Sequence, residues 1–133
     1  MKNLYSPSML KSYLSCKYTI FNEVNGNKLN LKKIELSKND QLRLEKGNIH
    51  EKDYLKELKK KYKKVIDLKN SKLSKEEKVP KTIQAMKDGW EVIHGGYLKR
   101  GNWRGEFDFL IINKDVKSKF GDYSYEVIDT KNS

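Results

Sequence analysis

The amino-acid sequence predicts an α+β fold, in which N-terminal helices pack on a small, mainly antiparallel sheet. Up to about residue 89, apolar residues recur at helical spacing and follow capping residues. After Gly89 apolar and polar residues alternate, which is the period of strands. Helices followed by strands are typical of this class. We therefore expect one domain over residues 1–133, mostly helical over 1–89 and a three-strand meander over 90–133.

The first predicted helix begins at Ser6-Pro7, because serine can cap a helix and proline suits its first position. This helix is expected to end near Cys16–Tyr18. Asparagines and a glycine then predict an irregular segment over residues 21–36.

A long second helix is predicted from Ser37 or Asp40, either of which can be the cap, through Gly47 to about Lys64. Its apolar stripe is imperfectly periodic. The stripe consists of Leu44, Ile49, Leu55, Leu58 and Tyr62.

The segment between this helix and Gly89 contains a short strand and a third helix. Residues 65–68 are Val-Ile-Asp-Leu, which favours a strand. Pro80 is predicted to open a helix over residues 82–88, and Gly89 closes it.

Three strands are predicted after Gly89, over residues 91–98, 103–112 and 123–131. A turn at residues 99–102 and a loop at residues 113–121 would join them. The last strand would have an open edge, which indicates either a small natural protein that ends here or the front part of a longer protein, and we expect the second. A homo-oligomer could also form through that edge.

The composition favours a polyanionic partner. The formal net charge is +11, and lysines far outnumber acids between Lys56 and Lys87. Such a block attracts nucleic acid over a Debye length of about 8–10 Å, although solvated helix faces would have the same composition. The residues predicted to contact nucleic acid are Lys59, Lys60, Lys61, Lys63, Lys64 and Arg104.

Membrane and disulfide chemistry are not expected. The sequence has no apolar run of membrane-spanning length and no apolar secretion segment at its start, so we expect a cytoplasmic protein without a membrane partner. Cys16 is the single cysteine, which excludes an internal disulfide and a self-contained cysteine metal site.

Alternation assigns faces within the strand over residues 103–112. It places Phe107, Phe109 and Ile111 on one face, with Glu106 and Asp108 on the other. A carboxylate at Asp108 on a half-buried face is costly unless it is paired or bound to a cation.

A hydrolytic site could form where the last two strands meet. Asp129 and Lys131 are two apart and share a strand face, whereas Glu126 points the other way. Asp108 and Asp129 could hold a divalent cation while Lys131 positions a water. Structural ion pairs, with Asp108 bound to Lys131 or Arg104, are the alternative.

The two histidines differ in their surroundings. His50 and Tyr54 are four apart on one helix face, and a neutral imidazole can complete the coordination of a cation. A lone surface histidine is the alternative for His50. His94, beside Gly95-Gly96, is predicted to be structural.

Three segments carry a family pattern in their order: Gly47-Asn48-Ile49-His50-Glu51, Gly105-Glu106-Phe107-Asp108 and Asp129-Thr130-Lys131. They resemble the successive motifs of the PD-(D/E)XK nucleases, in particular the RecB-like branch, and the start Ser6-Pro7-Ser8-Met9-Leu10 is similar to that branch. The resemblance implies a restriction-endonuclease-like core, here incomplete at its C-terminus. It also implies a divalent-metal-dependent nuclease that hydrolyses phosphodiester bonds, in DNA rather than RNA.

By this resemblance Asp108, Asp129 and Lys131 would be catalytic. Asp108, Asp129, the Thr130 carbonyl and His50 would bind Mg²⁺ or Mn²⁺, and Lys131 would orient the attacking water. Some relatives hold an iron–sulfur cluster on four cysteines; Cys16 stands alone, so no cluster is expected. Further candidates at this site are Glu51, Tyr54, Glu106 and Glu126.

Two other functions stay open at this point. One is a nucleic-acid-binding module derived from such a nuclease that does not cleave. The other is a structural α+β domain whose charged residues form ion pairs and whose surface binds a partner.

Overall fold

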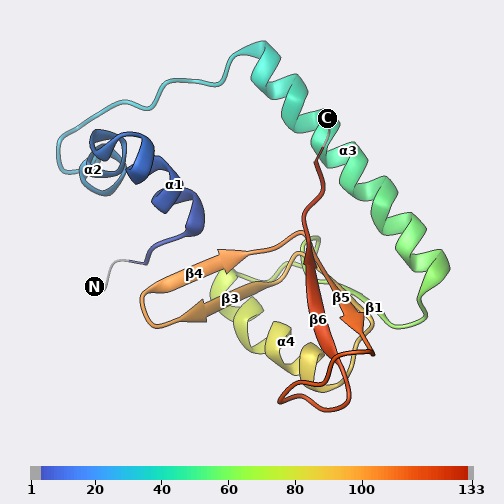
Figure 1. Ribbon diagram of the computed structural model, residues 1–133. Helices are drawn as coiled ribbons and strands as arrows, with labels where there is room; N and C mark the ends of the chain where they lie inside the picture. Colours follow the sequence, from blue (N-terminus) through green and yellow to red (C-terminus); the bar gives the residue numbers. More distant parts are fainter. Residues whose placement is uncertain (1–3, 132–133) are drawn as a thin grey trace.

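The computed structural model describes residues 4–131 and has the expected α+β class. A four-stranded mixed sheet has the strand order β1-β2-β5-β6, and β3 and β4 form a separate two-stranded sheet. Helices α3 and α4 lie on opposite faces of the larger sheet, while α1 and α2 lie apart from it (Figure 1).

The N-terminal residues form two short helices. Helix α1 (Pro7–Ser15) begins as predicted, since the side chain of Ser6 accepts a hydrogen bond from the Met9 amide. The irregular segment expected from residue 21 is wrong in its first part, because α2 continues over Lys17–Asn25. Asparagine is a poor helix former but no breaker, and the Asn25 amide bonds the Phe21 carbonyl one turn back.

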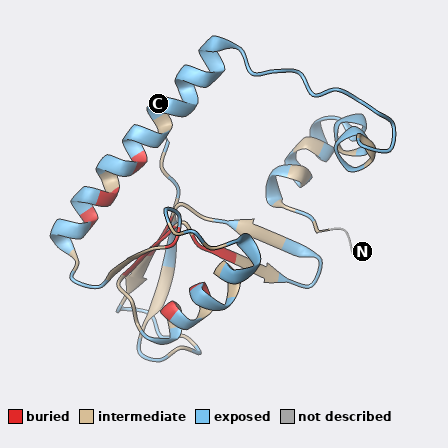
Figure 2. Ribbon diagram, turned by 180° about the vertical axis from the view of Figure 1, so that it is seen from behind, coloured by how far each residue is buried: buried red, intermediate tan, exposed pale blue. Residues whose placement is uncertain are grey.

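The long helix α3 (Lys38–Lys61) is capped by Ser37, as predicted. Only its C-terminal half packs on the sheet, through Glu51, Tyr54, Leu55 and Leu58. These residues follow the regular helical spacing. The predicted stripe was wrong in its first half: Leu44 and Ile49 are exposed, and Figure 2 shows the first half of the helix as almost entirely exposed.

A parallel crossover follows. Strand β1 (Val65–Asp67) pairs in parallel with β2 (Val92–His94), and α4 (Lys75–Lys87) connects them. Helix α4 begins five residues before the position predicted from Pro80, because Ser74 and Glu77 form a capping box. The predicted end at Gly89 is confirmed, since Gly89 has a φ of 71° after the C-cap.

The next strands form one long hairpin that is bent at its middle. Strand β3 (Tyr97–Arg100) and β4 (Trp103–Glu106) form its outer half, while β2 and β5 (Phe109–Asn113) form its inner half. The predicted continuous strand over residues 103–112 is therefore interrupted at Phe107-Asp108.

The interruption overturns the predicted faces. Phe109 and Ile111 pack with α3, whereas Phe107 packs on the α4 side with Leu110. Alternation fails because the bend adds residues outside the ladder.

Strand β6 (Ser124–Ile128) pairs antiparallel with β5 and is the outer strand of the sheet. It is shorter than the predicted strand over residues 123–131. Within β6 the side chains alternate between the two faces, since Ile128 packs with the α3-side core and Tyr125 with the α4-side core. Over residues 4–131, no helix is long and apolar enough to cross a membrane.

Candidate functional site

Most of the candidate catalytic and metal-binding residues lie at one edge of the larger sheet, namely the edge formed by the carboxyl ends of β1 and β2. Asp67 and His94 lie at the ends of the parallel strands β1 and β2, where they are paired in register. Asp108 precedes β5 and Asp129 follows β6, and both of these strands are antiparallel to their neighbours at this edge. Strand direction therefore brings together residues that are far apart in the sequence.

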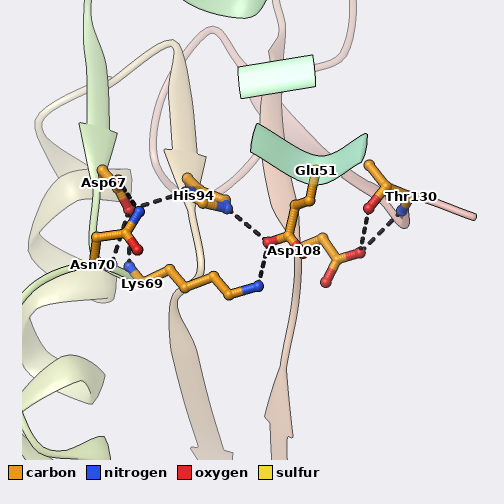
Figure 3. A network of polar contacts seen from close by, with 7 residues as sticks. All are labelled: Glu51, Asp67, Lys69, Asn70, His94, Asp108 and Thr130. Carbon is orange, nitrogen blue, oxygen red and sulfur yellow. Dashed lines mark hydrogen bonds and ion pairs between the residues drawn. The ribbon is translucent and has the colours of Figure 1, made fainter. Parts of the chain in front are cut away.

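A polar network, defined as Glu51, Asp67, Lys69, Asn70 and His94, extends from the buried Glu51 and His94 to the exposed Lys69 and Asn70 (Figure 3). His94 Nδ1 lies 2.9 Å from Asp67 Oδ1, and His94 Nε2 lies 2.7 Å from Glu51 Oε1. The Lys69 ammonium donates to the same Glu51 oxygen at 2.6 Å. His94 is 1% exposed and its ring stacks on Phe109 with centroids 4.6 Å apart.

His94 connects the two carboxylates of the network. Each of its ring nitrogens lies within hydrogen-bond distance of one carboxylate, so the imidazole bridges Asp67 and Glu51. Burial raises the pKa of Glu51, but the hydrogen bonds from Lys69 and His94 outweigh this effect and hold the pKa below its usual value. The pKa of Asp67 is also below its usual value. Burial raises this pKa, but the hydrogen bonds from Asn70 and the interaction with His94 outweigh the effect of burial.

The carboxylate pair, defined as Asp108 and Asp129, lies at the surface of the same edge. Asp108 Oδ2 accepts from the Thr130 amide at 2.9 Å and from the Thr130 hydroxyl at 3.0 Å. Lys131 Nζ lies 2.5 Å from Asp129 Oδ2. The pKa of Asp129 is lowered, chiefly by its bond to the Lys131 ammonium and to a smaller extent by a contact with Asp108. In return, Asp129 raises the pKa of Lys131.

A cleft of about 80 Å³ lies between the network and Asp108. Glu51 and Lys69 line it from one side and Asp108 from the other, as the side chains in Figure 3 show. Lys75 and Lys78 of α4 also line this cleft. With Glu106, three acidic and three lysine side chains thus surround a space large enough for a few waters.

The structure brings together only part of the predicted site. It places Asp108, Asp129, Thr130 and Lys131 side by side. His50 is exposed on α3, and its neighbour Glu51 faces the sheet instead. The predicted group of His50, Asp108 and Asp129 is not assembled: over residues 4–131, no three His, Cys, Asp or Glu side chains converge on a common cation position.

The remaining candidates have other surroundings. Tyr54 packs its ring edge-on against Phe109 in the core. Glu106 forms an exposed ion pair with Lys75 at 2.6 Å and lines the same cleft as Asp108. Glu126 accepts a hydrogen bond from the side-chain amide of Asn113 on β5 at 2.8 Å.

The predicted nucleic-acid-binding lysines lie away from this edge. Lys59, Lys60 and Lys61 end α3, and Lys63 and Lys64 immediately precede β1. Because Asp67 is at the other end of β1, these lysines lie at the opposite edge of the sheet. The cations near Asp108 are instead Lys69, Lys75, Lys78 and Lys131.

Sequence reasoning missed the part played by His94, Asp67 and Lys69. A signal for two of them was present: Val65-Ile66-Asp67 and Val92-Ile93-His94 are short apolar strands, each ending in a polar residue, around a helical segment. If the segment is interpreted as a β-α-β unit, the two strands are parallel, and Asp67 and His94 then lie at the same edge of the sheet. Lys69 had no comparable signal, because its place depends on the turn after β1.

Comparison with known proteins adds no assignment. No protein-family model, no curated protein and no solved structure matches this chain.

Proposed function

We propose that this protein is a divalent-metal-dependent nuclease of the RecB-like PD-(D/E)XK type, with a restriction-endonuclease-like core. The observation that supports it is the convergence of Asp108, Asp129 and Lys131 at one sheet edge from two antiparallel strands. Asp108 and Asp129 place carboxylate oxygens close together beside a lysine, which is the kind of oxygen-rich surface that hard divalent cations bind. This arrangement suits a site for a divalent cation.

The donor set fits Mg²⁺ or Mn²⁺. Both ions prefer hard oxygen ligands, and the carboxylate pair supplies these together with the Thr130 carbonyl. Thr130 uses its amide and hydroxyl to hold one oxygen of Asp108, which leaves Asp108 Oδ1 for a ligand. A bound cation would offset charge on the scissile phosphate and lower the pKa of a coordinated water.

The protein's own residues have distinct parts in this proposal. Lys131, 80% exposed and next to Asp129, orients the water and stabilises the charge that develops on the phosphate. Thr130 fixes the carboxylate plane of Asp108 through its two hydrogen bonds. Glu51 is the acid that α3 contributes to the cleft, and the bonds from His94 and Lys69 hold it in place.

Cleavage of a plasmid and of a labelled oligonucleotide with Mn²⁺ tests this proposal. Lys131→Ala should lower the cleavage rate by about 100- to 1,000-fold, the usual cost of losing one group that stabilises transition-state charge. Its affinity for DNA should stay nearly unchanged, because this lysine is one of 29 Lys+Arg residues.

Lys117→Ala is the matched control, since Lys117 also forms an exposed ion pair, with Asp122 at 3.6 Å. The control should cleave at the unaltered rate. EDTA-sensitive cleavage by Lys131→Ala at the rate of the unaltered protein would remove the nuclease assignment of this strand.

A second candidate is a nucleic-acid-binding module that does not cleave. It is favoured by the presence of two, not three, convergent acidic groups over residues 4–131 and by the bonds from Thr130 that already engage Asp108. Salt-sensitive DNA binding in EDTA, with no cleavage at any concentration of Mn²⁺, would identify this function.

A further inference from the structure

A large groove runs along the bent hairpin on the side of α4. Its volume is about 920 Å³, and it lies between β3, β4, α4 and the loop before β6. Its apolar floor is formed by Ile83, Met86, Leu98, Trp103 and Phe120. Gly105 leaves the groove open between them, since a Cβ atom there would meet nothing within 4 Å.

Cations surround this apolar floor. Lys87, Arg100, Arg104 and Lys119 line the groove, together with Lys99, and among the described residues that line it none is acidic. Lys99 is bound to Glu76 at 2.9 Å. The groove therefore combines an apolar, aromatic floor with a positive rim.

The aromatic residues are accessible to a ligand. Trp103 is 48% exposed, and its ring lies tilted against that of Tyr5 with centroids 6.1 Å apart. Phe120 is half-buried at the opposite wall of the groove. Base faces stack on such rings, and they are free to do so in single strands but covered in a duplex.

We propose that this groove binds single-stranded nucleic acid, with bases stacked on Trp103 and Phe120 and phosphates bound by Arg100, Arg104 and Lys119. Charge complementarity selects this occupant, because an apolar partner without negative charge would leave the cationic rim unpaired. Gly105 lines the groove and the next residue, Glu106, lines the cleft of Asp108, so the groove and the cleft both border β4.

This inference deepens the proposed function, because it specifies that the bound nucleic acid is single-stranded. It rests on the proposed function only for the assumption that the partner is a nucleic acid. It is tested without cleavage, by fluorescence anisotropy of a labelled oligothymidylate in EDTA. Failure of this binding leaves the cleavage experiment unaffected, and failure of cleavage leaves this binding unaffected.

The variants separate stacking from charge. Trp103→Ala should raise the Kd about fivefold or more, which is the effect of losing one stacked base. The Kd of Trp103→Phe should stay within about twofold of the unaltered protein's value. Arg100→Ala should weaken binding and reduce the slope of log K against log salt by about 0.7, the contribution of one phosphate contact on a single strand.

Two controls match these changes. Tyr18→Ala removes an exposed aromatic residue from α2, and Arg43→Ala removes an exposed arginine from α3. Both should bind as the unaltered protein does. Circular dichroism melting of Trp103→Ala checks its folding, and Phe120→Ala gives a second test of stacking at the other wall.

Three results would overturn the proposal. One is equal losses in Arg100→Ala and Arg43→Ala, which would indicate diffuse attraction to the whole basic surface. Another is binding of duplex as tight as that of single strands. The third is a dimer that Trp103→Ala dissociates, without oligonucleotide binding, because the groove would then hold a second copy of the chain.

Discussion

Glu51, and not its neighbour His50, is the residue that α3 turns toward the sheet. Adjacent residues on a helix point about 100° apart, so burial of Leu55 and Leu58 decides which of the two faces inward. Glu51 then lies against His94 and Lys69, and its charge is compensated in the interior. Over residues 4–131, every buried side-chain nitrogen and oxygen has a hydrogen-bond partner.

Glu51→Gln should destabilise the protein at neutral pH by about 2 kcal/mol, because it replaces charge-assisted hydrogen bonds from His94 and Lys69 with weaker ones. The folded-state pKa of Glu51 is lowered, so its contribution is complete above the usual value near 4 and disappears as the pH falls through the lowered value. The difference in unfolding free energy between the two proteins should therefore shrink toward zero in acid.

Urea denaturation from pH 7 to pH 2 measures this difference. Glu57→Gln is the control, since Glu57 is exposed on the same helix and pairs only with Lys60 at 3.5 Å. A constant offset between Glu51→Gln and the unaltered protein across this pH range would contradict the charge-based account.

Among the secondary-structure elements, the bent hairpin formed by β2, β3, β4 and β5 is the one that positions the site. At Gly95-Gly96 and Phe107-Asp108 the ladder is interrupted, and the Gly95 amide bonds the Asp108 carbonyl at 2.9 Å. Gly95 has a φ of 68° and lies against the turn that carries Lys69. The glycine thus allows Lys69 to approach the strand that ends in His94.

Gly95→Ala should be more destabilising than Gly101→Ala. Both positions have positive φ, which costs alanine about 1 kcal/mol, but a Cβ atom at Gly101 would meet nothing within 4 Å. A Cβ atom at Gly95 would lie 2.7 Å from Lys69 Cα, and this overlap with backbone should add about 1–3 kcal/mol. Thermal or urea unfolding of both variants gives the comparison; equal losses would show that the turn after β1 moves away freely.

At the scale of the whole molecule, stability is concentrated around the four-stranded sheet. Its two cores contain Val92 and Phe109 on the α3 side, and Ile93 and Leu110 on the α4 side. Over the described residues 7–25, which include α1 and α2, no side chain is buried. Two backbone hydrogen bonds connect this region to the rest: the Tyr5 amide donates to the Asn102 carbonyl in the turn of the β3–β4 hairpin, and the Tyr5 carbonyl accepts from the Arg104 amide in β4.

Hydrogen–deuterium exchange should therefore divide the chain into two parts. Peptides from β2 and β5 should be protected to nearly the global unfolding free energy, whereas residues 7–36 and the first half of α3 should exchange by local opening. Mass spectrometry at several exchange times makes the measurement. Equal protection of α1 and β5 would show that the N-terminal helices are covered in solution, for example by self-association.

Much of the local structure followed from the sequence because it depends on neighbouring residues. Ser6 and Ser37 cap helices where their side chains can reach the first free amides, and Gly89 ends α4 because it accepts a positive φ. The capping box at Ser74 was equally local and was overlooked beside Pro80.

The sequence by itself also indicated that the segments carrying Asp108 and Asp129 belong to neighbouring antiparallel strands, although both residues lie just outside the ladder, where alternation assigns no face. Only the tertiary structure decided the rest of the candidate site. Which of His50 and Glu51 faces inward depends on how α3 packs, and the meeting of Asp67 with His94 depends on the parallel crossover. Both are set by burial of apolar side chains between elements distant in sequence, and no local pattern contains that information.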